Sequence, residues 1–80
     1  MKIIFDVLHL YYLPQYLPVY HQLILENAGE ATFVFYHGIH DDIIKTIIAK
    51  EQLNHIWVDN NAEACNFYCK EQADWVFFAN

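Results

Sequence analysis

Basic residues are scarce in this sequence of 80 residues. Four Lys and Arg stand against ten Asp and Glu, which gives a formal net charge of −6 at pH 7. A nucleic-acid interface needs a basic face to neutralise phosphates, so this balance argues against a nucleic-acid partner. The same shortage of positive charge argues against binding to an anionic membrane surface by charge.

Glycine is also sparse, with only two residues. The loop that we expect after the first strand, around residues 9–15, contains none. A pyrophosphate is held by close approach of the backbone, which glycine permits and bulkier residues prevent. The sequence therefore argues against a Rossmann dinucleotide site and against a P-loop.

The two cysteines, Cys65 and Cys69, are too few for a disulfide framework. They are four residues apart on an expected helix, so they share one face. Because free cysteine is among the most buried residue types, we expect both to be buried as small hydrophobic residues.

Long apolar runs are absent as well. No run approaches the roughly 20 apolar residues of a membrane-spanning helix. Asp6 interrupts the first apolar run, and no small-residue cleavage site follows it, so the start of the chain does not resemble a signal peptide. We therefore expect a cytoplasmic location.

Apolar and aromatic residues, by contrast, are abundant. The apolar fraction is 56% and the aromatic fraction 18%. Both are high for a chain of this length, which buries only about 60% of its unfolded surface on folding. These values predict a strand-rich core, or a surface that a partner covers.

Apolar and β-branched runs alternate with helical patterns along the whole chain. We expect strands at residues 2–8, 31–36, 54–59 and 74–80, and helices ending near 29, over 42–52, and from 60 or 61 to about 72. This alternation implies parallel strands joined by right-handed crossovers. We therefore predict an α/β fold in a single domain over residues 1–80. It is a three-layer half-Rossmann with a four-stranded parallel sheet of order 3-2-1-4.

Two prolines leave the start of the first helix open. Pro14 suits the first helical position, where its missing N–H costs nothing. Alternatively, the regular helix begins at Pro18 and residues 10–17 form an ordered loop. Gly29 is expected to end the helix in the left-handed conformation. The expected inward face consists of Leu17, Tyr20, Leu23, Ile24 and Ala28.

The second and third helices carry clearer start signals. Asp41 and Asp42 are expected to open the second helix, one as N-cap and one as a first-turn acid. Its inward stripe is expected to be Ile43, Ile44, Ile47 and Ile48. Asn60 or Asn61 is the expected N-cap of the third helix, whose inward residues are expected to be Ala64, Cys65, Tyr68 and Cys69.

Asp6 lies late in the first strand, where a strand approaches the ligand edge of a sheet. Buried polar groups are normally satisfied locally, so we expect its carboxylate to accept backbone N–H bonds from a neighbouring loop. Asp59 ends the third strand, the position of the phosphoacceptor in receiver domains. Asp6 has no acidic neighbour, however, and no fifth strand brings a lysine, so a receiver domain is not favoured.

Ligands of open α/β sheets bind beyond the carboxyl ends of the strands. The loop after the first strand carries His9, Tyr11, Tyr12 and Gln15 at that edge. These residues predict a polar and aromatic platform for a sugar, polyol or phosphorylated acceptor. His9 is the candidate catalytic base or hydrogen-bond partner. An alternative of equal weight is that the tyrosine rings only seal the end of the sheet.

The loop at residues 37–40 follows the second strand and ends at the same edge. We expect His37, Gly38 and His40 to add to the acceptor site. With the two acidic residues that follow, the two histidines could be drawn as a metal site. Their spacing fits no specific zinc pattern, so we favour a solvated loop and expect no metal.

The expected fourth strand, at residues 74–80, is strongly apolar. Without a covering helix it would leave an exposed hydrophobic edge and face, which natural domains avoid. We therefore expect that the chain is a fragment of a longer protein, or that it self-associates through this strand.

The first twenty residues resemble a known family. The run KIIFDV at residues 2–7, followed by HLYYLPQYLPVY at 9–20, resembles the N-terminus of GT-B glycosyltransferase-like proteins. More narrowly, it is similar to the CDP-glycerol glycerophosphotransferase group, which builds teichoic-acid-type polymers. The later runs at 33–36, 57–59 and 74–80 fall where the following strands of that fold would lie.

This resemblance implies a role in a two-lobe transferase. Such an enzyme transfers a group from a nucleotide-activated donor to a cell-wall or polysaccharide-type acceptor. Its N-terminal lobe mainly holds the acceptor, and the missing C-terminal lobe holds the donor, so no cofactor is expected within these residues. The resemblance also implies that His9 and residues 37–40 face the cleft between the lobes, and that the parent protein contacts the inner face of the membrane peripherally.

Two further hypotheses stay open. The chain could be a non-catalytic interaction domain that oligomerises through its fourth strand and third helix. It could also be a small flavodoxin-like module that binds a ligand on its own.

Overall fold

The computed structural model describes residues 1–27 and 29–78 and confirms the predicted fold. Four parallel strands form one sheet in the order β3-β2-β1-β4. The elements in chain order are β1 (Lys2–Val7), η1 (Leu10–Tyr12), α1 (Leu13–Leu25), β2 (Glu30–Tyr36), α2 (Asp41–Glu51), β3 (His55–Val58), α3 (Asn61–Glu71) and β4 (Trp75–Phe78). The last two residues of the predicted fourth strand lie outside the described part.

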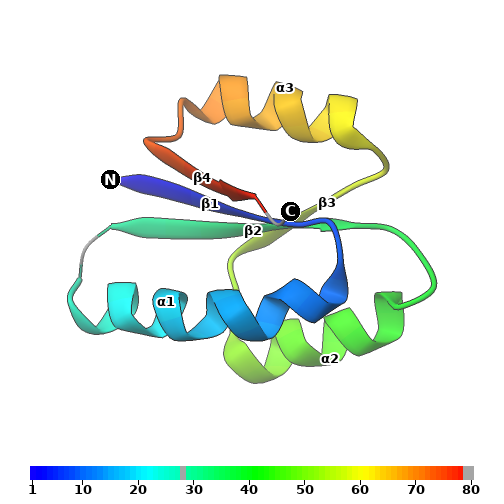
Figure 1. Ribbon diagram of the computed structural model, residues 1–80, viewed down its shortest axis with the longest axis horizontal. Helices are drawn as coiled ribbons and strands as arrows, with labels where there is room; N and C mark the ends of the chain where they lie inside the picture. The colour runs from blue at the N-terminus through cyan, green and yellow to red at the C-terminus, as the bar shows by residue number, and fades with distance from the viewer. Residues whose placement is uncertain (28, 79–80) are drawn as a thin grey trace.

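Helices cover both faces of the sheet, as right-handed crossovers require. Figure 1 shows α1 and α2 side by side below the sheet and α3 alone above it. Alternate residues of a strand point to opposite faces, so β1 serves both layers. Its odd-numbered residues pack against α1 and α2, and Ile4 packs against α3.

An aromatic cluster fills the layer between the sheet and α1. The Phe5 ring stacks on Phe33 with centroids 4.8 Å apart and on Phe77 with centroids 5.2 Å apart. The ring of Tyr16, from α1, lies 5.2 Å from Phe5, and Tyr20 meets Phe33 edge-on at 5.1 Å. Aromatic pairs at these separations add about 0.5–1.5 kcal/mol each beyond their buried area. This cluster joins β4, β1 and β2 to one helix.

The first helix begins before both prolines. A short 3₁₀ turn, η1, leads into α1, with Pro14 in its first turn and Pro18 inside it. Pro18 has no N–H to donate to the carbonyl four residues earlier, and a proline inside a helix costs about 3 kcal/mol. The burial of Leu13, Tyr16 and Tyr20 against the sheet offsets this cost. Of the two predicted starts, the structure agrees with the one near Pro14.

The end of α1 differs from the prediction. The left-handed position is taken by Asn27, with φ 53°, and not by Gly29. Asparagine tolerates this conformation because its short polar side chain bonds locally. Gly29 has φ 143° for another reason. A Cβ there would lie 2.2 Å from the carbonyl oxygen of Met1, which accepts the Glu30 N–H at 2.8 Å.

Several side chains predicted to face inward are exposed. Ile24 and Ile43 are more than half exposed, so the burying faces of α1 and α2 are narrower than their apolar stripes. Cys65 and Cys69 are exposed, so their predicted burial is wrong. The remaining predicted inward residues of these helices are buried or partly buried: Leu17, Tyr20, Leu23, Ile44, Ile47, Ile48, Ala64 and Tyr68. Ala28 lies outside the described residues.

The reason for these exposed residues is geometric. A helix that packs on one sheet contacts it with only part of its circumference, whereas apolar residues here occupy more of it.

The predicted cap of α3 is confirmed, and that of α2 is not. Asn60, one of the two predicted caps, caps α3 by accepting the Glu63 N–H at 3.0 Å. The N-cap of α2 is His40, so both Asp41 and Asp42 lie in the first turn. Among the helices described, none has both the length and the apolar character needed to cross a bilayer.

The aromatic cluster yields a stability prediction. Phe33 is fully buried, so Phe33→Ala should lower the free energy of unfolding by about 3–5 kcal/mol. Phe33→Leu keeps most of the volume and should cost about 1 kcal/mol. Urea denaturation followed by circular dichroism measures both. Leu25→Ala is the control, because Leu25 is 81% exposed. Equal losses for Phe33→Ala and Leu25→Ala would contradict this assignment of the core.

Candidate functional site

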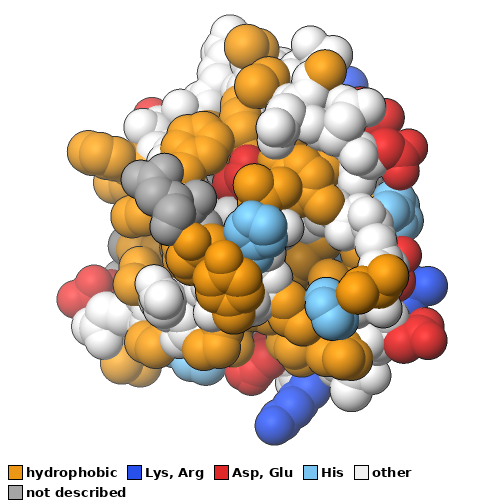
Figure 2. Space-filling model, turned by 45° about the vertical axis from the view of Figure 1, so that its right-hand side comes forward, with side chains coloured by type: hydrophobic (Ala, Val, Ile, Leu, Met, Phe, Trp, Pro, Cys, Tyr) orange, Lys and Arg blue, Asp and Glu red, His pale blue; other side chains and the backbone are white. Residues whose placement is uncertain are grey.

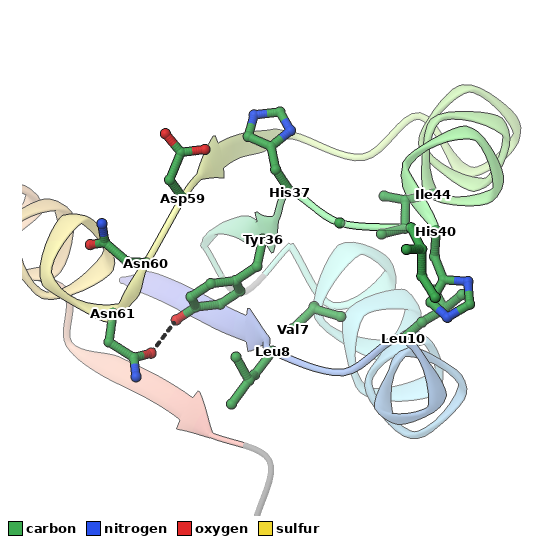
Figure 3. A pocket seen from close by; sticks show the side chains of 12 residues that line it. Val7, Leu8, Leu10, Tyr36, His37, His40, Ile44, Asp59, Asn60 and Asn61 are labelled. Carbon is green, nitrogen blue, oxygen red and sulfur yellow. Dashed lines mark hydrogen bonds between the residues drawn. The ribbon is translucent and has the colours of Figure 1, made fainter.

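A cavity of about 540 Å³ opens at the carboxyl edge of the sheet. The loops after β1, β2 and β3 form its walls, together with the start of α2 (Figure 3). Its lining residues are Val7, Leu8, Leu10, Tyr36, His37, Gly38, Ile39, His40, Ile44, Asp59, Asn60 and Asn61. The cavity therefore lies where open α/β sheets bind ligands, and it includes three of the predicted acceptor residues.

The loop after β2 is held by Asp41. One oxygen of its carboxylate accepts the Gly38 N–H at 2.8 Å, and the other lies 3.2 Å from His37 Nδ1. These two contacts, that to Gly38 first, lower the pKa of the Asp41 carboxyl group below its usual value. The Asp41 carboxylate thus holds the turn with one oxygen and orients the imidazole of His37 with the other.

His37 also stacks on a neighbouring strand. Its ring lies parallel to the indole of Trp57, with centroids 4.8 Å apart and an angle of 14° between the planes. A ring held on one face by an indole and at one nitrogen by a carboxylate has little freedom to turn. Among the described residues, none forms a hydrogen bond with its other nitrogen, Nε2.

The loop after β3 supplies hydrogen-bonding groups to the opposite wall. Figure 3 shows Asp59, Asn60 and Asn61 following one another along this loop. The Glu63 side chain accepts the backbone N–H of Asp59 at 2.9 Å, while Asn60 accepts the Glu63 N–H. These two bonds hold the loop on the first turn of α3, and the Asp59 carboxylate remains in the cavity wall.

The loop after β1 borders a second, adjacent hollow. His9, Tyr11 and His40 line this hollow of about 350 Å³, which shares Leu8 and Leu10 with the main cavity. The rings of His9 and Tyr11 stack with centroids 5.3 Å apart. The first loop therefore forms an aromatic shelf beside the main cavity.

Two of the predicted acceptor residues lie apart from these walls. Tyr12 is half-buried beside Tyr11, and Gln15 is exposed in the first turn of α1. Neither lines the main cavity or the adjacent hollow. The structure thus brings His37, Gly38 and His40 to one cavity and places His9 and Tyr11 next to it.

Asp6 behaves differently from the expectation. The residue is 5% exposed, and within the described part of the chain its carboxylate accepts two phenol hydroxyls and no backbone N–H. Tyr36 donates to Oδ2 at 2.9 Å, and Tyr68 of α3 donates to the same oxygen. Burial and the bond to Asp6 raise the pKa of Tyr36 to about 12. Burial and the same carboxylate raise the pKa of Tyr68 further.

Several residues in this region carry no functional signal in the sequence. The sequence pattern places Tyr36 only in its strand and assigns Asn60 and Asn61 only to capping. The available signal was topological. Residues that directly follow β2 and β3 must share an edge with those that follow β1, because all the strands are parallel. The approach of Tyr68 to Asp6 depends on the packing of α3 and leaves no local pattern.

The site has few charged side chains and few groups that could bind a metal ion. No Lys lines the main cavity. Figure 2 shows the same face, where histidine and apolar side chains occupy the middle and lysines lie at the rim. Within the described residues, no group of three His, Cys, Asp or Glu side chains is placed to hold a metal ion.

Comparison with known proteins adds no relatives. No protein-family model, no curated protein and no solved structure matches this chain.

The raised pKa of Tyr36 gives a pH prediction. A phenol with a raised pKa keeps its proton more tightly in the folded state. Its contribution to stability is complete below pH 10 and is lost as pH rises through about 12. We expect the urea midpoint to fall over this interval, and to fall less in Tyr36→Phe. Tyr11→Phe, which changes an exposed ring, should keep the wild-type slope. Identical pH profiles for wild type and Tyr36→Phe would contradict the contact with Asp6.

Proposed function

We propose that this chain binds a neutral, hydroxyl-rich acceptor, a sugar or polyol, in the cavity at the carboxyl edge of the sheet. The observation that carries the proposal is the lining of that cavity. It combines two imidazoles, a carboxylate and two amides, which follow β2 and β3, with no lysine. Hydroxyl groups are both donors and acceptors, so they match such a mixed set, whereas a phosphate would meet the Asp59 carboxylate.

Apolar surface in the same walls supports this choice. Ile39 is 94% exposed at the cavity rim, and Val7 and Leu8 come from the end of β1. The C–H faces of a sugar or polyol pack on such surface while its hydroxyls reach the polar groups. Small-molecule sites combine these two kinds of lining.

His37 supplies the chemistry that a transferase acceptor site needs. An acceptor hydroxyl becomes a nucleophile when a base removes its proton, and an imidazole oriented by a carboxylate is suited to that step. The contact of His37 with Asp41 provides this orientation. His9, the predicted base, lies on the adjacent shelf and contacts a longer acceptor.

The wider role follows the resemblance of residues 2–20 to GT-B transferases. On this proposal the chain is the acceptor side of a glycosyl- or glycerophosphotransferase in the cytoplasm. A nucleotide-activated donor binds a second lobe. In the full-length enzyme, His37→Ala should lower kcat by about a hundredfold or more, as loss of a general base does. His9→Ala should raise KM for the acceptor, and unchanged turnover in both variants would contradict the assignment.

Binding by the chain itself can be tested directly. Saturation-transfer NMR with glycerol and glucose should show contact, and inorganic phosphate should not compete. His37→Ala and Asp59→Ala each remove a hydrogen-bonding group worth about 1 kcal/mol, so affinity should fall about fivefold. The matched control is His21→Ala, since His21 lies on α1 and pairs with Glu51 away from the cavity. Competition by phosphate at equal concentration would overturn the proposed ligand class.

A second candidate function is self-assembly, and the exposure of β4 favours it. Trp75 is 61% exposed and Phe78 is 60% exposed, and Phe77 is partly exposed. In the described part, β4 pairs with β1 on one edge only. We propose a second copy of the chain as the occupant, pairing β4 with β4 across a two-fold axis, because the same surface then satisfies both partners.

Sedimentation velocity tests this assembly. The wild-type chain should form dimers as its concentration rises, and Trp75→Lys should weaken dimerisation by about tenfold or more, because it places a charge in an apolar contact. Leu25→Lys is the control, since Leu25 is an exposed apolar residue at the end of α1. A chain that stays monomeric at all concentrations would refute the dimer and leave acceptor binding unaffected.

A further inference from the structure

A further cavity, also of about 350 Å³ but distinct from the hollow lined by His9 and Tyr11, lies on the α3 side of the sheet edge. Its walls come from the end of β1, the end of β2, the first turns of α3 and the tip of β4. The lining residues are Asp6, Leu8, Tyr36, Asn61, Ala64, Cys65, Tyr68 and Phe78. We call it the Asp6 cavity. It shares Leu8, Tyr36 and Asn61 with the main cavity.

The free oxygen of Asp6 faces this cavity. Both tyrosine hydroxyls donate to Oδ2, and no hydrogen bond from a described residue reaches Oδ1. Yet no buried side-chain oxygen in the described residues lacks a partner. Oδ1 is therefore not sealed in the protein, and the open space that it contacts is the Asp6 cavity.

The carboxylate also has no cation. Buried charges in proteins are normally paired, because a lone buried charge costs several kcal/mol. The ion pairs of the described residues join Lys2 to Glu71 and two histidines to other acids, and none includes Asp6. The two phenols stabilise the carboxylate by hydrogen bonds but bring no positive charge.

The walls around Oδ1 suit an organic cation. Tyr68 and Phe78 meet edge to face at 5.8 Å and, with Tyr36, make a largely aromatic wall. Aromatic rings attract ammonium groups by about 0.5–2 kcal/mol. The Tyr36 hydroxyl lies 2.9 Å from Asp6 Oδ2 and 3.2 Å from Asn61 Oδ1, the second contact being drawn in Figure 3. An amide oxygen has two lone pairs, so Asn61 Oδ1 can accept a further hydrogen bond. A metal ion is less well served, because Asp6 is the only carboxylate in the lining.

We propose that the Asp6 cavity binds the primary ammonium group of a small organic amine, which donates N–H bonds to Oδ1 of Asp6 and to Oδ1 of Asn61. This site adjoins the acceptor site proposed above and shares Leu8, Tyr36 and Asn61 with it. It depends on a buried carboxylate and aromatic rings, whereas the main cavity depends on His37 and Asp59.

The test compares ethanolamine with 1-propanol, which replaces the ammonium by a methyl group of similar size. Heteronuclear NMR titration of the chain should show saturable shifts near Tyr36 and Tyr68 with ethanolamine only. Asp6→Asn should weaken this binding by about tenfold or more, as loss of a charged partner does. Tyr68→Phe keeps the ring and the carboxylate, so it should retain part of the affinity. Tyr68→Phe therefore tests the proposal if Asp6→Asn does not fold.

The two cysteines offer an internal control in the same molecule. Cys65 lines the Asp6 cavity, and Cys69, one turn later on α3, is exposed but does not. Ethanolamine should slow alkylation of Cys65 by iodoacetamide and leave Cys69 unchanged, as peptide mass spectrometry can measure. Equal binding of 1-propanol, equal competition by potassium chloride, or equal protection of both cysteines would each overturn the proposal. Loss of sugar binding in His37→Ala would not affect it.

Discussion

The burial of β1 on both faces is the constraint on which the rest of the structure depends. Five of its six residues are buried, and the strand lies between β2 and β4. Side chains of a strand alternate, so Phe5 points into the aromatic cluster under α1, and Asp6 points toward α3. The same pleat that anchors the hydrophobic core thus places a carboxylate in the opposite layer. Removing water from both faces is what makes that carboxylate costly and its two phenol partners necessary.

The fold could be predicted because its signals are repeated along the chain. Four apolar runs separated by helical patterns admit few arrangements once crossovers are right-handed and strands parallel. The order 3-2-1-4 is one of the two common doubly wound orders that fit this alternation, and choosing it required no single residue to be interpreted correctly. Errors at individual positions, such as Ile24 or the cysteines, therefore left the architecture unchanged.

Exposure and capping were harder to predict, because tertiary contacts decide them. An apolar stripe shows that a helix has an inner face, but the sheet beneath determines how wide that face is. Cys65 and Cys69 share a helical face, and α3 covers its side of the sheet alone, so the flanks of that helix stay open. At α2, Asp41 looked like an N-cap from its position. Its carboxylate instead turns back to Gly38, and His40 takes the cap position.

The sequence predicted the edge of the sheet at which the candidate site lies, but not all of the residues that line it. Parallel topology correctly placed His37, Gly38 and His40 beyond the end of β2, next to the loop after β1. The topology did not show that Gln15 lies outside the cavity. The 3₁₀ turn η1 ends at Tyr12 and α1 begins at Leu13, so Gln15 belongs to the helix and not to the loop. Whether a loop residue faces a cavity depends on how many residues the turn uses before the helix begins, and sequence patterns fix such boundaries poorly.

The charge of this edge is the reason that we propose a neutral acceptor and not an anionic one. Helix N-termini usually attract phosphates, since their free N–H groups and dipole are positive. Here acidic side chains lie in the first turns themselves, Asp41 and Asp42 in α2 and Glu63 in α3. The Asn60 side chain also accepts the N–H of Glu63 at 3.0 Å.

These acids offset the positive ends of both helices, and two further carboxylates, Asp59 and Asp6, line the cavities. A phosphate that approaches this edge would be repelled by these carboxylates. A hydroxyl carries no charge, so it exchanges one hydrogen bond to water for one to the protein at little electrostatic cost. An ammonium group is attracted where a phosphate is repelled. The same acids therefore support both proposals, a polyol in one cavity and a cation in the other.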